Sequence, residues 1–95
     1  MKLVVTGSAL ADIERLHAFL KNKNRAAAQR VVSVLDGAMQ SLRTAPERGR
    51  RSDVSGAREL IVPFGRSAYV LRYVYSAAQD EIIVFRIWHG REQRD

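Results

Sequence analysis

Three arginines and one histidine stand out as the residues that could do chemistry. Arg58, Arg72 and Arg86 each lie within a run of apolar residues, and His89 follows the last run, in the segment Phe-Arg-Ile-Trp-His-Gly-Arg. A guanidinium group binds phosphate or carboxylate through two parallel hydrogen bonds, and histidine exchanges protons near neutral pH. Such groups could cleave RNA, in which a base activates the 2′-hydroxyl, a cation stabilises the phosphorane and an acid protonates the leaving oxygen. They could equally bind an acidic protein.

Side chains alternate between the two faces of a strand, and this alternation separates the candidate residues. Counting along the last apolar run, His89 falls on the same face as Ile83, Phe85 and Ile87, whereas Arg86 falls on the opposite face. This parity argues against a joint active site of Arg86 and His89. It favours His89 as a strand-end residue that is hydrogen-bonded to backbone.

The face that carries Arg86 has an unusual predicted composition. We expect Val84 and Trp88 there, together with one arginine from each of three strands, namely Arg58, Arg72 and Arg86. An apolar surface of this kind usually marks a binding site. Two alternatives remain open: the polar loop that precedes these strands could fold over the face, or the arginines could extend past it to solvent.

Hydrophobic periodicity predicts one α+β domain that spans residues 1–95. A β-branched strand over residues 2–6 precedes two helices, the first with Ser8 as its N-cap and the second over residues 25–44 with Asn24 as its N-cap. Three more strands are predicted by short apolar runs between turn residues, over 57–63, 67–76 and 81–90. The expected order is β-α-α-β-β-β, with a helical hairpin packed on a mostly antiparallel four-stranded sheet.

Composition narrows the possible partners. The formal net charge is +6, and thirteen of the sixteen basic residues are arginine, which favours nucleic acid or an acidic protein as partner, although a GC-rich genome would produce the same bias. The absence of cysteine and the presence of only two, distant histidines predict no metal site, and we expect no cofactor. No apolar run approaches the ~18 residues of a membrane span and no signal peptide is recognisable, so we expect a cytoplasmic protein without membrane contact.

Four segments occur in the order and at the spacing of a known protein family. They are Pro46-Glu47-Arg48-Gly49-Arg50, Gly56-Ala57-Arg58-Glu59-Leu60, Tyr69-Val70-Leu71-Arg72-Tyr73 and Phe85-Arg86-Ile87-Trp88-His89-Gly90-Arg91. With them the chain resembles the RelE/ParE superfamily of bacterial type II toxin–antitoxin toxins, and it is most similar to the ParE, or plasmid-stabilisation, branch. The resemblance covers nearly the whole chain, and the expected element order is also that of the family.

The resemblance implies a toxin that is neutralised by a cognate antitoxin, whose acidic C-terminal segment would wrap it. ParE-type members are understood to inhibit DNA gyrase by protein–protein contact, without catalysis of their own, whereas RelE-type members cut mRNA in the ribosomal A site. RelE-like toxins tend to use basic residues on the central strands together with a C-terminal tyrosine. In this chain the catalytic candidates would be Arg58, Arg72, Arg86 and His89, but no tyrosine follows His89.

We therefore expect a toxin that inhibits gyrase and is not itself an enzyme. A RelE-like ribosome-dependent mRNA endoribonuclease is the alternative. A nucleic-acid-binding domain is a third possibility, weakened because no aromatic residues lie among the loop arginines. The expected antitoxin contacts combine an apolar stripe on the first helix with the arginine-bearing face of the sheet: Leu16, Phe19, Arg58, Arg72, Val84, Arg86 and Trp88.

Overall fold

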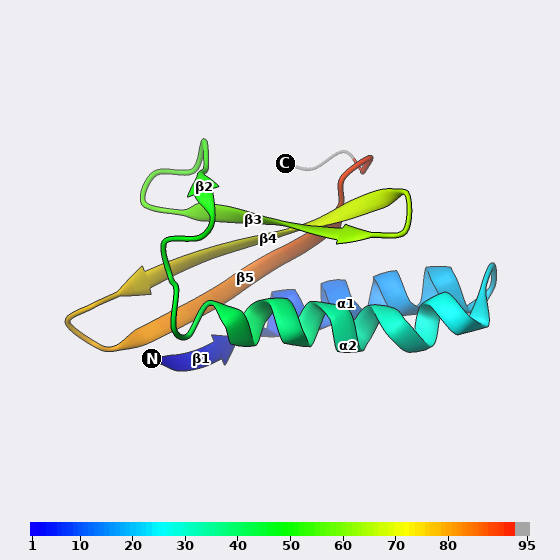
Figure 1. Ribbon diagram of the computed structural model, residues 1–95, viewed down its shortest axis with the longest axis horizontal. Helices are drawn as coiled ribbons and strands as arrows, with labels where there is room; N and C mark the ends of the chain where they lie inside the picture. The colour runs from blue at the N-terminus through cyan, green and yellow to red at the C-terminus, as the bar shows by residue number, and fades with distance from the viewer. Residues whose placement is uncertain (93–95) are drawn as a thin grey trace.

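Two helices pack against one face of a mixed five-stranded sheet (Figure 1). The computed structural model describes residues 1–92 of the 95-residue chain. Its elements, in chain order, are β1 (Lys2–Val5), α1 (Gly7–Lys21), α2 (Arg25–Ser41), β2 (Arg50–Arg51), β3 (Arg58–Phe64), β4 (Ser67–Ser76) and β5 (Glu81–His89). The predicted α+β class is confirmed, with one additional strand: β2 lies in the segment that we expected to be a polar loop.

The strands lie in the order β1-β5-β4-β3-β2. β1 runs parallel to the first half of β5, and the other neighbouring strands are antiparallel. The predicted meander of β3, β4 and β5 is present, and its two turns contain Gly65 and Asp80, each with a positive φ. β1 pairs only with residues 81–84 of β5, so the outer edge of the remaining half of β5 is left for α1 to cover.

Thr6 begins α1, two residues earlier than the predicted N-cap at Ser8. Its Oγ1 accepts a hydrogen bond from the backbone N of Ala9 at 3.2 Å. Its own N–H still donates to the carbonyl of Val84 on β5 at 3.0 Å. A single threonine therefore ends the sheet pairing of β1 and caps the helix, which fixes where α1 crosses the sheet.

Asn24 caps α2 as the sequence predicts. Its Oδ1 accepts a hydrogen bond from the backbone N of Ala27 at 3.0 Å, which satisfies one of the donors that every helix N-terminus leaves free. The helix ends at Ser41 rather than at Thr44, and the intervening residues form a turn. The two helices are joined by only three residues and pack against each other side by side (Figure 1).

The hydrophobic core fills the layer between the helices and the sheet. Leu16 of α1 is buried there, whereas Phe19, which we expected on the same apolar stripe, is 60% exposed, and Leu10 of the same helix is 51% exposed. The other large core side chains come from α2 and the three long strands: Val31, Leu35, Met39, Leu42, Leu60, Val62, Tyr69, Leu71, Tyr73, Ile82, Val84 and Ile87.

A β-bulge interrupts β5 and changes which side chains face the helices. Arg86 pairs with Arg72 and Val84 pairs with Tyr73, so Phe85 has no partner on β4. An extra residue of this kind shifts the alternation by one position from there onward.

The predicted parity along β5 therefore holds beyond the bulge, where His89 shares a face with Ile87 and lies opposite to Arg86, and is wrong before it. Val84 lies in the core on the helix side, and so does Ile87 beyond the bulge. His89 pairs with Tyr69, another core residue, and shares the helix side. We expected Val84 on the opposite face, because unbroken alternation had been assumed.

Candidate functional site

Arg72 is buried on the sheet face away from the helices, and it is neutralised within the chain. Its Nε and Nη2 donate to Oε2 of Glu59 at 3.2 and 2.9 Å, and its Cζ lies 4.8 Å from the centroid of the Trp88 ring. Ser52 donates its hydroxyl to the same carboxylate oxygen at 3.0 Å. Burial on its own would raise the pKa of Glu59, but the hydrogen bonds from Arg72 and Ser52 and the charge of Arg72 outweigh it, and the pKa is lowered.

Arg86 turns toward the edge of the sheet. Its Nε donates to Oδ2 of Asp12 on α1 at 3.0 Å, and the backbone N of Ile87 donates to the same oxygen at 2.8 Å. Arg15 donates to the other oxygen, Oδ1, at 3.3 Å. Burial would raise the pKa of Asp12, but the N–H of Ile87 and the guanidinium groups of Arg86 and Arg15 lower it overall. The arginine in the middle of β5 thus neutralises a buried carboxylate on the edge that β1 leaves uncovered.

Arg58 lies on the opposite face of the sheet from Arg72. Arg58 pairs with Tyr73 across β3 and β4, whereas its neighbour Glu59 pairs with Arg72. The Arg58 Nη1 donates to the backbone carbonyl of Gly49 at 2.7 Å. This arginine supports the loop between α2 and β2.

The predicted groove studded with arginines is therefore wrong. Val84 is fully buried beneath the helices, and Trp88 is only 3% exposed. The prediction failed for two reasons: it did not include the bulge in β5, and it placed Arg58 rather than Glu59 on the face of Arg72. A carboxylate on that face and the aromatic ring of Trp88 allow Arg72 to be buried, which removes the need for an external partner there.

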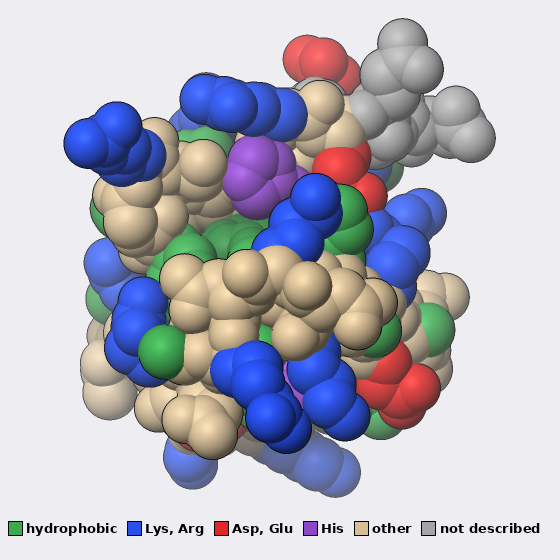
Figure 2. Space-filling model, turned by 90° about the vertical axis from the view of Figure 1, so that its right-hand side faces the viewer, with side chains coloured by type: hydrophobic (Ala, Val, Ile, Leu, Met, Phe, Trp, Pro, Cys, Tyr) green, Lys and Arg blue, Asp and Glu red, His purple; other side chains and the backbone are tan. Residues whose placement is uncertain are grey.

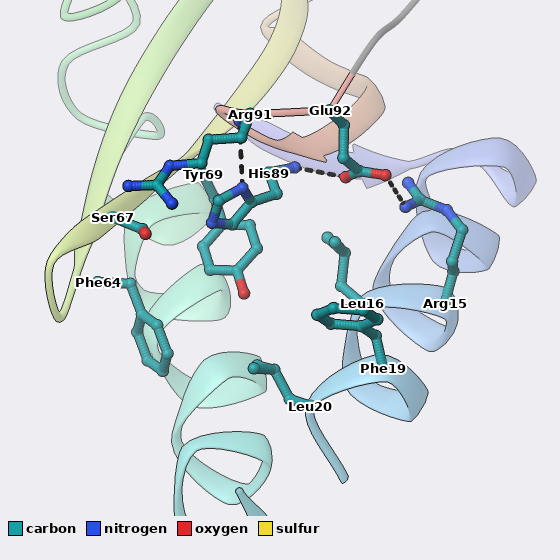
Figure 3. A pocket seen from close by; sticks show the side chains of 10 residues that line it. All are labelled: Arg15, Leu16, Phe19, Leu20, Phe64, Ser67, Tyr69, His89, Arg91 and Glu92. Carbon is teal, nitrogen blue, oxygen red and sulfur yellow. Dashed lines mark hydrogen bonds and ion pairs between the residues drawn. The ribbon is translucent and has the colours of Figure 1, made fainter. Parts of the chain in front are cut away.

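A different groove is present, on the helix side and at the end of the molecule where α1 and α2 are connected. We call it the α1–β4 groove, and its volume is 680 Å³. Figure 2 looks onto this end and shows hydrophobic side chains in a hollow below a histidine. Its walls are mostly apolar, with Leu16, Phe19 and Leu20 from α1 facing Phe64, Tyr69 and His89 from the sheet (Figure 3). Of the predicted antitoxin contacts, this groove contains Leu16 and Phe19.

Basic side chains surround the α1–β4 groove. Arg15 and Arg91 line it directly. Lys23 places its Nζ 5.0 Å from the ring centroid of Phe19, and the Cζ of Arg30 lies 5.7 Å from that of Phe64. An apolar floor with a cationic rim is complementary to an amphipathic segment that carries carboxylates.

His89 is held in one tautomer by the residues that follow it. Its Nδ1 accepts a hydrogen bond from the backbone N of Arg91 at 3.1 Å, so the neutral ring carries its proton on Nε2. The ring packs edge-on against Tyr69, with centroids 5.3 Å apart. Burial and the nearby charge of Glu92 raise the pKa of Tyr69. The protonated hydroxyl of Tyr69 is therefore available in this part of the groove as a hydrogen-bond donor.

Glu92 fastens the end of the described chain to α1. One of its carboxylate oxygens accepts a hydrogen bond from the backbone N of His89 at 2.6 Å, and the other pairs with Arg15. Figure 3 shows this bridge along one rim of the α1–β4 groove. Residues 93–95, which follow Glu92, lie outside the described part of the chain.

Sequence reasoning missed Asp12, whose carboxylate accepts hydrogen bonds from both the side chain of Arg86 and the backbone N of Ile87. It was interpreted only as an acidic residue in an early turn of the helix, where the dipole favours it. A usable signal was its spacing: Asp12 precedes Leu16 by four residues, which places both on the same buried face of a helix. A carboxylate on such a face needs a cationic or N–H partner, and Arg86 is that partner.

The molecule is thus a small α+β domain in which a helical hairpin packs on a meander sheet, with an apolar groove and a basic rim at one end. The model of the family described as "ParE toxin of type II toxin-antitoxin system, parDE" matches residues 3–94. The chain therefore belongs to the ParE toxin family of type II toxin–antitoxin systems, and the resemblance drawn from its sequence is confirmed. Membership of this family implies a cognate antitoxin as partner.

Two relatives from Caulobacter vibrioides match over almost their full length. The chain is 41% identical to Toxin RelE1 over 92 residues, covering 97% of this chain and 96% of that protein. It is 35% identical to Toxin RelE3 over 96 residues, covering 99% and 100% respectively. A chain from a structure described as the chromosomal ParDE system of P. aeruginosa is similar in fold, with a TM-score of 0.78 at 22% identity, over 94% of this chain and 95% of that one.

Neither helix has the length and apolar character that crossing a lipid bilayer would require, as far as residues 1–92 are concerned.

Proposed function

We propose that this toxin acts in the cytoplasm by binding DNA gyrase through protein–protein contact, and that its antitoxin neutralises it by inserting an acidic amphipathic segment into the α1–β4 groove. The observation that carries the second part is the pairing of an apolar floor with a rim of Arg15, Lys23, Arg30 and Arg91. Apolar side chains of the segment would fill the floor, and its carboxylates would meet the rim.

The arrangement of the nominated catalytic residues supports a binder rather than a nuclease. Arg58 and Arg72 lie on opposite faces of the sheet, and Arg72 and Arg86 each have a carboxylate partner inside the chain. Cleavage of RNA needs cations that converge on one phosphate, together with a base at the 2′-hydroxyl. These arginines stabilise the fold instead of converging.

Gyrase inhibition is tested with purified toxin, gyrase and supercoiled plasmid. We expect the toxin to increase the amount of cleaved plasmid that detergent traps on gyrase, and we expect prior addition of the cognate antitoxin to prevent the increase. The same toxin added to a translation extract should leave mRNA intact. Cut mRNA without any trapped cleavage complex would reverse the assignment.

A ribosome-dependent endoribonuclease remains the second candidate, because of one feature of the groove. His89, Tyr69 and Arg91 meet there, and together they could supply a proton donor and a cation for a bound nucleotide. The relatives from Caulobacter are also named RelE toxins. If this candidate is correct, His89→Ala abolishes mRNA cleavage while binding of the antitoxin persists; under the gyrase proposal it leaves cleavage-complex formation nearly unchanged.

The antitoxin-binding groove is tested by Phe19→Asp. Phe19 is 60% exposed on the wall of the groove, so the change places a negative charge against the incoming segment with little cost to the fold. We expect antitoxin binding to weaken by about 2 kcal/mol or more, measured by calorimetric titration. Leu10→Asp is the matched control, because Leu10 is also an exposed apolar residue of α1 but does not line the groove. Equal losses for the two variants would contradict this location.

A further inference from the structure

The sheet brings two couples of arginines face to face across neighbouring strands. Arg72 of β4 pairs with Arg86 of β5, and Arg51 of β2 pairs with Arg58 of β3. Directly opposite residues point to the same face of a sheet and lie close together, so two like charges in these positions destabilise the pairing. A compensating anion would therefore stabilise each couple.

The Arg72–Arg86 couple has its anions within the chain. Arg72 binds Glu59 at 2.9 Å and Arg86 binds Asp12 at 3.0 Å. Both carboxylates are buried. This couple shows how the fold compensates facing arginines when no outside partner is involved.

The Arg51–Arg58 couple has no such compensation within residues 1–92. Arg58 donates only to the backbone carbonyls of Gly49 and Glu47 and lies 6.0 Å from the ring centroid of Tyr75. The exposed side chain of Arg51 makes no hydrogen bond or ion pair with any described residue. Of the acidic residues in this segment, Glu47 accepts a hydrogen bond from the Tyr75 hydroxyl, and neither Glu47 nor Asp53 forms an ion pair with a described residue.

Further positive charge surrounds this couple. Arg48, two residues before β2, is exposed, and its guanidinium donates a hydrogen bond to the uncharged hydroxyl of Ser41. Arg50 does not add to this charge, because it pairs with Glu59 on the opposite face of the sheet, where its Nη2 lies 3.4 Å from Oε1 of that carboxylate. The surface formed by Arg48, Arg51 and Arg58, which we call the β2 arginine surface, therefore carries positive charge that pairs with no carboxylate of the described residues.

The β2 arginine surface lies far from the α1–β4 groove. It sits at the start of β3, whereas the groove includes Phe64 at the end of β3. The molecule is 42 Å long and 24 Å across, and Figure 1 shows β2 and the turn between β3 and β4 toward opposite ends. An antitoxin segment in the groove would leave the β2 arginine surface accessible.

We propose that the β2 arginine surface binds the phosphate backbone of duplex DNA, with Arg51 and Arg58 sharing one phosphate. Arginine's planar fork suits phosphate oxygens, and a bound phosphate would supply the anion that this couple lacks. Backbone contacts of this kind are independent of base sequence. The choice of DNA over other polyanions rests on the proposed function, since a gyrase inhibitor works next to DNA.

The test measures fluorescence anisotropy of a labelled 20-base-pair duplex titrated with the full-length toxin at several salt concentrations. Non-specific DNA binding has a Kd of about 10⁻⁴–10⁻⁶ M at physiological salt. The titration therefore begins at low salt, where binding is tighter. We expect Arg51→Gln to weaken binding several-fold and to reduce the slope of log K against log salt by about 0.9. Arg66→Gln is the matched control, because Arg66 is an exposed arginine at the turn between β3 and β4.

A thermal unfolding scan of the same variants guards against misfolding. Arg51→Gln should not lower the melting temperature, because it removes one of two facing like charges. Equal weakening by the Arg51 and Arg66 variants would overturn the site in favour of diffuse charge attraction. Tighter binding to a polyglutamate peptide or to duplex RNA than to duplex DNA would overturn the choice of partner. An increase in the melting temperature of the toxin with inorganic phosphate equal to that with the duplex would overturn it too.

This experiment is separate from the gyrase assay. A toxin that traps gyrase on DNA yet binds no free duplex would retain the proposed function and lose this inference. A toxin that binds duplex through Arg51 but traps no gyrase on DNA would retain the DNA-binding surface and contradict the proposed gyrase inhibition. Duplex binding should also persist when the antitoxin is bound, because the two surfaces are apart.

Discussion

The hydroxyl of Tyr73 holds two backbone groups of the loop that joins α2 to β2. It donates to the carbonyl of Pro46 at 2.7 Å and accepts from the N–H of Gly49 at 2.9 Å. A side chain at position 49 would clash, because an added Cβ would lie 2.7 Å from this hydroxyl. The segment Pro46-Glu47-Arg48-Gly49-Arg50, which we identified from its family resemblance, thus has a structural role that its residue types explain.

Tyr73→Phe tests this role. The change leaves the buried N–H of Gly49 without a partner, so we expect the free energy of unfolding to fall by about 1–3 kcal/mol, measured by urea denaturation. Tyr75→Phe is the control, because the Tyr75 hydroxyl bonds only to the exposed carboxylate of Glu47 at 3.5 Å. A loss as large in Tyr75→Phe would show that the two loop contacts of Tyr73 are not the cause.

At the scale of elements, α1 completes the sheet where β1 ends. Asp12 accepts the N–H of Ile87, and Arg15 donates to the carbonyl of the same residue at 3.3 Å. These side chains occupy the positions that a longer β1 would have filled with backbone groups. An uncovered strand edge is a site of unwanted pairing with other chains, so this contact both anchors α1 and protects β5.

Asp12→Ala should release this edge. We expect a loss of about 2 kcal/mol in the free energy of unfolding, since hydrogen bonds to a charged group are removed, and faster hydrogen exchange at the amide of Ile87. Asp36→Ala is the control, because Asp36 is an exposed acidic residue of α2. Unchanged exchange at Ile87 would argue that Asp12 is not what protects this edge.

At the scale of the whole molecule, two buried carboxylates set the acid limit of stability. Asp12 and Glu59 both have a pKa below their ordinary values of 3.8 and 4.5. At a given acidic pH the unfolded chain therefore binds more protons than the folded one, and the free energy of unfolding falls as pH decreases. The stabilisation is complete above the ordinary values and is lost as pH drops through the lower, folded ones.

We expect the urea midpoint to change little between pH 7 and about 5.5 on account of these two groups and to fall steeply below pH 4. Asp12→Asn and Glu59→Gln should each flatten the acid limb while lowering stability at pH 7, because the ion pairs with Arg86 and Arg72 are lost. Asp36→Asn should leave the dependence of the urea midpoint on pH unchanged. An unchanged acid limb in both buried-site variants would show that other groups control acid unfolding.

The sequence predicts the architecture well because local patterns determine it. The cap at Asn24, the apolar face of α2 and the three long strands all follow from residue type and spacing. The functional surfaces depend instead on how strands are registered. The bulge at Phe85 and the pairing of Glu59 with Arg72 are decided by contacts between distant segments, and no local pattern of charges reveals them.

The unpaired Phe85 divides β5 into two stretches whose orientations are set separately. If Phe85 paired with Arg72 instead, so that the alternation ran on without a bulge, every later residue of the strand would face the other side of the sheet. Trp88 would then point beneath the helices, and His89 would leave the cavity it now borders. What the cavity presents to a partner is therefore governed by the register of this strand as much as by the identity of its residues.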